Sequence, residues 1–489
     1  MPKSVIAIGA GIAGLAAAIR LAHAGYAVTV LEHKSQVGGI VCDYHSRGFS
    51  WTVAPSAFSA RPQLEALFHD LGRNLDDYLR LLPIDPQTRY FYPDGTVFNI
   101  CRDWTRTAAE IAQIEPGDVA GYLRFLAFAA RLHGIRRYGF GQSETATDSL
   151  FRSWLRAGPH RSAYSASSRF VRSEKLVRVL AHCASQSGGS PYAVPSTFSE
   201  LAHTFLNDGL WYPRGGVYAV PQTLANLAGE FDVSLRLVCP VKRIEIERNK
   251  AIGVTLEADG ELLRADAVIS NIDPISTARY LLPEEAISAP ALRGLVQTPM
   301  SSSAFIMLLG IRGTSPLLAH HNIFFSDDYR TEFDQIFRHG IMPEDPTITL
   351  SISCKTDALN APFNQENWLI AVSAPPLSEK VNWGTQAAVV RDRILTILEG
   401  RYGLDLSDRI RVEKHLTPAD LGRLSGAWRG ALHGELPHGR RAALARPQIR
   451  SRQVQNLYQV GAAISPGGGL PQAILSAKAA AAMLRHDLR

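Results

Sequence analysis

The N-terminal segment carries the pattern that most restricts the fold of this chain. An apolar run over residues 5–8 leads into "GAGIAG" (residues 9–14), and a helix of small residues follows. A second apolar run, residues 27–31, ends at Glu32. A tight glycine turn between a strand and a helix lets the backbone approach a pyrophosphate, and an acid after the second strand can accept hydrogen bonds from a ribose. The pattern predicts a βαβ unit that binds an adenine dinucleotide; the alternative is a glycine turn of purely structural use.

Two further features favour FAD over NAD as that dinucleotide. The doublet Gly38-Gly39 follows shortly after Glu32, where a chain that passes close to FAD needs small residues. Residues 238–274 are predicted to form a strand, a β-meander with a turn at Asp259-Gly260, and a buried strand, Ala267 to Ser270. FAD-binding folds insert such a meander and then return the chain to the dinucleotide.

The C-terminal segment repeats the ingredients of an anion-binding site. "NLYQVGAAISPGGGLPQAILSAK" (residues 456–478) reads as a strand, a glycine-rich turn and a long helix that opens at Leu470-Pro471. Helix N-termini present free N–H groups and the positive end of a dipole. We therefore expect this end of the chain to return to the N-terminal βαβ unit.

Composition narrows the class of protein. A chain of 489 residues exceeds the size of one hydrophobic core, so we expect at least two domains. The five cysteines form no CxxC pair, and the close pairs Cys42/His45 and His320-His321 lack the spacing of a metal site. No apolar run is long enough to span a membrane and no secretion signal is visible. We expect a cytoplasmic protein without a metal.

Several stretches together carry a resemblance to a known family. They are the N-terminal fingerprint with its glycine doublet, "LDDYLRLLPIDPQTRYFYPDGTVFNI" (75–100), "GLWYPRGGVYAVPQTLANLA" (209–228), "ADAVISNIDP" (265–274), "SSAFIMLLGI" (302–311) and the C-terminal segment. In this order and spacing the chain resembles the bacterial-type phytoene desaturase family of FAD-dependent oxidoreductases, relatives of the flavin amine oxidases.

The resemblance implies an FAD site built from both ends of the chain. The last helix would point its N-terminus at the isoalloxazine, where its dipole stabilises negative charge on the reduced ring. The implied cofactor-binding residues are Gly9, Gly11, Ala13, Gly14, Glu32, His33, Gly38, Gly39, Val241, Gly461, Ala462, Gly469, Leu470 and Ala473. The sequence departs from the family at Ile40, where Arg is usual, at residues 52–55, and at residues 463–465. These departures keep a non-catalytic role open.

The expected fold is α/β, with a discontinuous FAD-binding Rossmann-like domain and a mixed α+β substrate domain. We assign residues 1–75, 213–285 and 453–489 to the FAD-binding domain, and 76–212 and 286–452 to the substrate domain. Strand-like runs at 89–100, 302–311, 347–353 and 368–374 predict a mixed or antiparallel sheet in the substrate domain. Residues 104–183 are predicted to form a helical subdomain rich in basic and aromatic residues.

The helical subdomain contains an unusual excess of positive charge. Residues 121–175 hold ten basic and three acidic side chains, a net charge of +7, whereas the whole chain carries only +6. Basic groups beside aromatics suit docking on an anionic membrane, and ordinary solvated helix faces are the alternative. Nucleic acid is not an expected partner because no recognition motif accompanies the charge. The resemblance favours the membrane, since the family's polyisoprenoid substrates dissolve in bilayers.

The resemblance implies desaturation of an acyclic polyisoprenoid, of the phytoene or diapophytoene type, by hydride transfer from an allylic carbon to flavin N5. Candidates for lining the apolar substrate tunnel are Phe58, Tyr192, Trp211, Phe305 and Trp428, for which core packing is the alternative. No proton acceptor or other catalytic residue is identified, and oxygen or a quinone could accept the electrons. The competing functions are isomerisation, ketolation or saturation of a polyene, oxidation of a polar amine, and non-catalytic binding of a prenyl lipid.

Overall fold

A computed structural model describes residues 2–53, 58–139, 160–439, 442, 446–465 and 467–489. Its first layer is a five-stranded parallel sheet in the order β19-β13-β1-β2-β9. The strands are β1 (Ser4–Ile8), β2 (Ala27–Leu31), β9 (Ser234–Arg236), β13 (Ala267–Ser270) and β19 (Leu457–Gln459). The sheet therefore draws strands from the beginning, the middle and the end of the chain, as the sequence predicted. The short edge strand β9 was not predicted.

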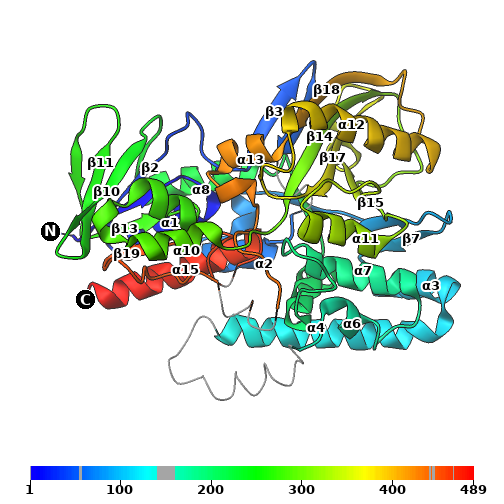
Figure 1. Ribbon diagram of the computed structural model, residues 1–489, viewed down its shortest axis with the longest axis horizontal. Coiled ribbons are helices and arrows are strands. Elements are labelled where there is room, and N and C mark those ends of the chain that lie inside the picture. The colour runs from blue at the N-terminus through cyan, green and yellow to red at the C-terminus, as the bar shows by residue number, and fades with distance from the viewer. Residues whose placement is uncertain (1, 54–57, 140–159, 440–441, 443–445, 466) are drawn as a thin grey trace.

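Helices of small and apolar residues cover this sheet. α1 (Ile12–His23), α8 (Ala219–Glu230) and α15 (Leu470–Asp487) share one hydrophobic core with α2 (Arg61–Asp70). α15 runs beside α1, which brings the last helix of the chain onto the first βαβ unit (Figure 1). The predicted meander is present as β10 (Val241–Glu247), β11 (Lys250–Leu256) and β12 (Leu262–Arg264), with Gly260 in the turn at φ +73°.

The second sheet is mixed and has seven strands in the order β18-β14-β17-β16-β15-β6-β7. Its strands are β6 (Thr88–Phe91), β7 (Val97–Ile100), β14 (Ser303–Arg312), β15 (His321–Phe324), β16 (Ile348–Ile352), β17 (Gln365–Ala374) and β18 (Ile410–Leu416). All four predicted strand-like runs lie in it, the first divided into the hairpin β6–β7. Among the strand pairs that the described residues form in this sheet, only β15–β6 is parallel. The structure thus has the expected α/β class, with a parallel Rossmann-like sheet and a mixed substrate-domain sheet; the exact domain boundaries remain a proposal.

Both faces of the long strand β14 are covered. Phe305, Met307 and Leu309 pack against α12 (Trp383–Gly400), while Ile306 and Leu308 pack against the hairpin of β3 (Cys42–Ser46) and β4 (Phe49–Val53). The hairpin starts directly after the glycine doublet. The substrate-domain sheet is therefore held against the dinucleotide-binding part of the chain by apolar contacts.

A layer of helices covers the face of the mixed sheet opposite α12. They are α3 (Trp104–Ile114), α4 (Val119–Gly139), α6 (Ala163–Ser167), α7 (Glu174–Ser185) and α11 (Tyr329–Asp334) (Figure 1). The predicted helical subdomain, residues 104–183, is therefore mostly helical in its described residues. Among the described residues, no helix combines the length and the apolar character needed to cross a bilayer.

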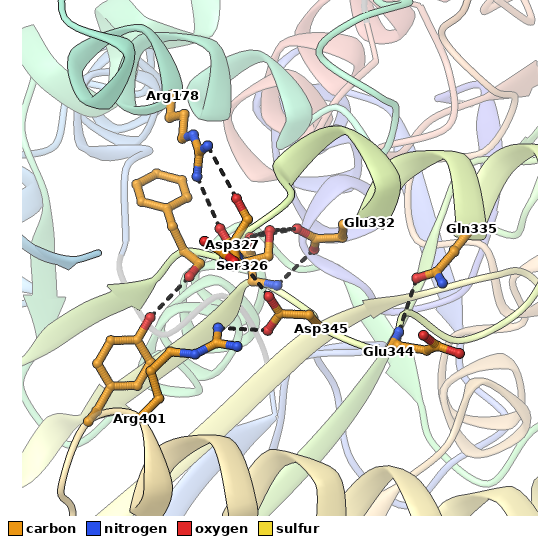
Figure 2. Close-up of polar contacts among 11 residues, drawn as sticks. Arg178, Ser326, Asp327, Glu332, Gln335, Glu344, Asp345 and Arg401 are labelled. Atoms are coloured by element: carbon orange, nitrogen blue, oxygen red, sulfur yellow. Dashed lines mark hydrogen bonds and ion pairs between the residues drawn. The ribbon is translucent and has the colours of Figure 1, made fainter. Parts of the chain in front are cut away.

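A buried polar cluster joins the helices to the sheet (Figure 2). Glu332 on α11 is 2% exposed and accepts hydrogen bonds from Ser326 Oγ (2.8 Å), Thr347 N (2.9 Å) and Thr347 Oγ1 (2.6 Å). Arg178 on α7 donates to the carbonyl oxygens of Ser326 and Asp327 at 3.0 and 3.3 Å. Burial raises the pKa of Glu332 to about 7, although the three donors oppose that shift.

Candidate cofactor and active site

The glycine turn after β1 is closely packed on every side. The Gly9 N–H donates to the carbonyl of Leu31 at 2.8 Å, so the turn is tied to the end of β2. A Cβ on Gly14 would lie 2.2 Å from the carbonyl oxygen of Gly9, and one on Gly11 would lie 2.7 Å from Asn271 Oδ1. Both distances are below any real contact, so only glycine allows this turn.

The glycine doublet lies directly against that turn. The Gly38 N–H donates to the carbonyl of Ala10 at 2.9 Å, and a Cβ on Gly39 would lie 3.5 Å from Gly11 Cα. Both doublet residues have positive φ, +111° and +65°. The two glycine segments therefore form one cradle of backbone at the first turn of α1, whose N-cap residue, Gly11, has no side chain to cap the helix.

Glu32 stands at the end of β2 beside this cradle. Its side chain is 3% exposed, and it accepts hydrogen bonds from the N–H groups of Ala10 (2.8 Å) and Lys34 (3.0 Å). His33 Nδ1 lies 3.0 Å from its Oε1. Burial lowers the pKa of Lys34, and the Glu32 carboxylate partly opposes that change. A carboxylate fixed by backbone N–H groups keeps lone pairs for ribose hydroxyls.

Asn271 connects the cradle to the C-terminal segment, a role that the sequence analysis missed. Its Oδ1 accepts from the Gly14 N–H at 2.9 Å, and its Nδ2 donates to the carbonyl of Val460 at 3.2 Å. It follows the buried strand β13 directly, and a polar residue at that place is the signal that could have identified it. One amide side chain therefore holds both ends of the chain at the cradle.

The C-terminal turn places the start of a second helix near the start of α1. The Gly461 N–H donates to Ser476 Oγ at 3.0 Å, and the Gly468 N–H donates to the carbonyl of Ala462 at 3.0 Å. No side chain caps α15 at Gly469, whose φ is +124°. Nearby, Gln472 Oε1 is buried without a hydrogen-bond partner among the described residues.

These features fit a bound FAD. The close packing at Gly11 and Gly14 keeps the turn free of side chains, and two helix starts offer N–H groups to a pyrophosphate and an isoalloxazine. Gln472 offers an acceptor that has no partner among the described residues. The expected residues that the structure gathers here are Gly9, Gly11, Ala13, Gly14, Glu32, His33, Gly38, Gly39, Gly461, Ala462, Gly469, Leu470 and Ala473. Val241 lies at the start of β10, packed with the apolar side chains beneath β1 and β2.

One buried carboxyl group, Asp273, and two half-buried ones, Asp43 and Glu435, lie near this region outside the ribose position. Asp43 on β3 accepts from Thr52 Oγ1 at 2.6 Å, and burial raises its pKa. Burial raises the pKa of Asp273 to about 6, against the hydrogen bonds that its carboxylate accepts from backbone N–H groups. Burial also raises the pKa of Glu435, and the positive charge of Arg446 partly opposes that rise. A Cβ on Gly434 would lie 2.7 Å from that of Ala463, so Glu435 follows a residue in contact with the C-terminal turn.

The five aromatic candidates for the substrate tunnel are not all brought together. Phe58 and Trp211 are paired through two backbone hydrogen bonds of 2.8 and 2.9 Å. Tyr192 lies in the helical layer against Tyr164, with ring centroids 4.4 Å apart. Phe305 stacks on Trp383 in the core on the α12 side of the sheet, and Trp428 packs beside Met300 and Arg279. Their role in substrate binding stays a prediction.

Other expectations fall partly on residues outside the described ranges. Residues 54 and 55 of the variant turn and residues 140–159 of the basic window lie there. Among the described residues, no group of three or more His, Cys, Asp or Glu side chains could hold a metal ion.

Comparison with known structures shows the same fold. Cyclohexylamine oxidase from Brevibacterium oxydans superimposes with a TM-score of 0.62 at 18% identity, covering 100% of both chains. An oxidoreductase from Methanosarcina mazei superimposes with a TM-score of 0.65 at 16% identity, covering 97% of this chain and 98% of that one. At this level of identity the likeness establishes the fold alone.

Comparison with known sequences establishes the family as well as the fold. Residues 12–307 match the family of flavin-containing amine oxidoreductases. A lycopene-forming phytoene desaturase of Pseudescherichia vulneris is 32% identical, with 100% of both chains aligned. A 4,4'-diapolycopene oxygenase of a Methylomonas species is 34% identical over 100% of this chain and 99% of that one. A zeta-carotene-forming phytoene desaturase of Myxococcus xanthus is 32% identical over 97% and 92%. The chain therefore belongs to the flavin-containing amine oxidoreductase family, within its carotenoid desaturase and oxygenase members, and is an FAD-dependent oxidoreductase of the phytoene desaturase type.

Proposed function

We propose that this oxidoreductase desaturates an acyclic polyisoprenoid of the phytoene or diapophytoene type. The observation that carries the proposal is full-length similarity, at 32–34% identity, to enzymes named for linear carotenoids. The solved amine oxidase with the same fold is only 18% identical. The cradle described above supports the cofactor part of the proposal.

Desaturation removes a hydride and a proton from adjacent carbons of the substrate. Bound FAD supplies the hydride acceptor at N5. The protein must hold the reacting carbon in place and exclude water, because an allylic cation is delocalised by the neighbouring double bonds but is attacked by solvent. Little acid–base machinery is required, which agrees with the absence of a catalytic triad from the sequence pattern.

The N–H groups at the start of α1 would hold the pyrophosphate and Glu32 the ribose. The start of α15 would place the positive end of a helix dipole beside the isoalloxazine and so favour its reduced, negatively charged form. Gln472 would accept a hydrogen bond from the cofactor. Each role rests on the cradle geometry and the two helix starts.

For the proton, Glu435 is the strongest candidate. It follows the residue that packs on Ala463, and its raised pKa brings it closer to neutral pH, where a base can both accept and release a proton. Asp273 is the alternative, but it also caps α9 (Pro274–Ser276) through the N–H groups of Ile275 and Ser276. Glu435→Gln should slow flavin reduction by substrate while FAD affinity stays unchanged.

Substrate access completes the proposal. Phe58 and Trp211 are bridged to each other beside the core of α1, α2 and α15 and would line the tunnel there, while Tyr192 would line it within the helical layer. Residues 121–175 would help a cytoplasmic, peripheral enzyme dock on anionic membranes, and oxygen or a quinone would reoxidise the flavin. Arg131→Glu, Arg136→Glu and Arg137→Glu together should weaken binding to anionic liposomes without loss of flavin.

The experiment is anaerobic reduction of the purified flavoprotein by phytoene or diapophytoene in liposomes. Bleaching of the oxidised flavin spectrum, together with a product that has an additional double bond and no oxygen, would support desaturation. A flavin that stays oxidised under these conditions, with oxygen incorporated from ¹⁸O₂ in an aerobic reaction, would replace desaturation by oxygenation.

A further inference from the structure

Two loops of the mixed sheet carry large apolar side chains that face solvent. Leu317 is 71% exposed, Leu359 is 79% exposed and Phe363 is 100% exposed. Because the side chain of a fully exposed phenylalanine is surrounded by water, its burial against an apolar partner would be favourable in free energy. Residues 313–320 and 353–364 are called the loop surface below.

Strand register places both segments at the same end of the sheet. β14 ends at Arg312, which pairs with Gln365 at the start of β17, and His321 at the start of β15 pairs with Ser351 near the end of β16. The Gly313 N–H donates to the carbonyl of Asn364 at 3.0 Å, which joins the two segments directly. Lys355 Nζ also donates to the carbonyl of Ser315 at 2.9 Å. The three apolar side chains therefore project from one continuous surface.

Basic side chains surround the loop surface. Arg47, at the tip of the β3–β4 hairpin, donates to the carbonyl of Arg411 at 3.3 Å, and a Cβ on the next residue, Gly48, would lie 3.2 Å from Pro362. Arg47, Arg312 and Arg411 form no ion pair with any described residue. The exposed charged residues at this end of the sheet are basic Arg47, Arg214, Arg312, Lys355 and Arg411 and acidic Asp405 and Asp408. Lys355 is paired with buried Glu366 at 3.0 Å, so the four arginines stand against two exposed aspartates. Positive charge is thus in excess around the apolar centre.

The loop surface is also connected to the cofactor cradle. Asn360 Nδ2 donates to Tyr212 Oη at 2.9 Å, and the Gly215 N–H donates to Asp357 Oδ2 at 2.8 Å. A Cβ on the adjacent Gly216 would lie 2.8 Å from Thr52 Oγ1 on the hairpin that follows the glycine doublet. The exposed loops are therefore joined, through residues 212–216, to the hairpin that follows the glycine doublet.

We propose that the loop surface docks the enzyme on an anionic lipid bilayer, with Leu317, Leu359 and Phe363 inserted among the acyl chains. The partner follows from charge and shape: protruding apolar side chains need an apolar phase, and the surrounding arginines need an anionic interface. The proposal rests on the proposed function in one respect, that a polyisoprenoid is taken from a bilayer, but binding to lipid can be measured without substrate.

The loop surface differs from the basic window at residues 121–175 in which side chains it exposes. In that window Tyr122 is 3% exposed and Phe125 is 0% exposed, so these aromatics belong to the core and cannot enter lipid. Lys175 is engaged with Asp94 at 2.5 Å. Among the described residues of the window, Leu123 is the exposed large apolar side chain, at 39%, so the window offers less apolar area for insertion than the loop surface.

The test compares the holoenzyme with two matched triple variants. Leu317→Ser, Leu359→Ser, Phe363→Ser removes the proposed insertion; Val97→Ser, Val238→Ser, Val389→Ser removes three side chains that are 46%, 68% and 48% exposed on other parts of the surface. Binding is measured by cosedimentation with vesicles of phosphatidylglycerol and phosphatidylcholine, and with phosphatidylcholine alone. Activity on a polyene in detergent micelles and the flavin spectrum report whether each variant is folded.

The loop variant should bind anionic vesicles at least about tenfold more weakly than the parent, because three side chains no longer leave water. The valine control should bind like the parent, and binding of the parent should weaken in salt and on neutral vesicles. Equal binding of the loop variant and the parent would overturn the proposal, as would a loss of binding confined to the 121–175 charge-reversal variant. A parent that is a dimer in solution and becomes a monomer in the loop variant would assign the surface to a second copy of the chain. A parent that binds vesicles but oxidises no polyene would refute only the proposed function.

Discussion

Replacing Asn271 with leucine should weaken FAD binding more than it weakens the fold. The asparagine side chain accepts from Gly14 N–H and donates to the carbonyl of Val460, at 2.9 and 3.2 Å. Leucine has a similar size but makes neither bond, so each backbone group loses its partner. A typical intramolecular hydrogen bond contributes about 0.5–1.5 kcal/mol, which gives about 1–3 kcal/mol for the pair. If that free energy holds the two ends of the cradle together, the dissociation constant of FAD rises about 5–150-fold.

The assay is titration of the apoprotein with FAD, followed by flavin fluorescence, beside a thermal unfolding curve of the same preparation. Asn322→Leu is the matched control, because Asn322 is equally an asparagine whose side chain bonds the backbone, accepting from Ala319 N and donating to the carbonyls of Ala319 and Leu350. It lies in the mixed sheet, so it should lower the unfolding temperature and leave FAD affinity unchanged. Equal FAD affinity in the parent and in Asn271→Leu would refute the role assigned to Asn271.

Three further predictions concern the cofactor and the polar cluster. FAD should be bound non-covalently, because no His or Cys of the flavin motifs is suited to a covalent link; acid precipitation should release all yellow colour, and colour in the pellet would contradict this. Glu32→Arg should weaken FAD binding by about 1.5–3 kcal/mol, since a hydrogen-bonded carboxylate is lost, and unchanged flavin content after dialysis would count against it. Burial raises the pKa of Glu332 from 4.5 to about 7, so its ionisation costs stability as pH rises from about 4.5 to 7. Relative to Glu332→Gln, the parent should lose about 3 kcal/mol over that window; thermal midpoints that follow the same pH profile in both proteins would show that Glu332 does not titrate there.

Local patterns in the sequence were sufficient to predict most strands of the dinucleotide-binding part. Strands β2 and β13 have the predicted bounds, and β1 begins one residue earlier than predicted, because each is a short run of buried β-branched and small residues with polar or glycine residues at its end. The edge strand β9 was not predicted, since three residues carry no measurable periodicity. The contact of Gly39 with Gly11 required the fold, although both glycines were already assigned to the cofactor.

Patterns were less informative where both faces of an element are covered. β14 is apolar on both faces, so the sequence could not indicate that Phe305 packs towards α12 while Ile306 packs towards the hairpin. The cluster around Glu332 was equally inaccessible, because Arg178, Ser326 and Thr347 come from separate segments and each is an ordinary polar residue in its own context. Polar partners far apart in sequence leave no periodic signal.

Strand order explains why the C-terminal segment has to return to the beginning of the chain. β1 lies between β2, which it reaches through α1, and β13, which arrives from the meander, so the direction of chain connections reverses at the β1–β13 boundary. Ligands of open parallel sheets bind at the carboxyl ends of strands where such a reversal opens a crevice. Gly9 follows β1 and Asn271 follows β13, which places them on the two sides of that crevice. β19 pairs with β13 on the outer side, so the C-terminal glycine turn can reach the cradle only across Asn271. The position of this one side chain is therefore a consequence of topology, and its loss should separate cofactor binding from folding.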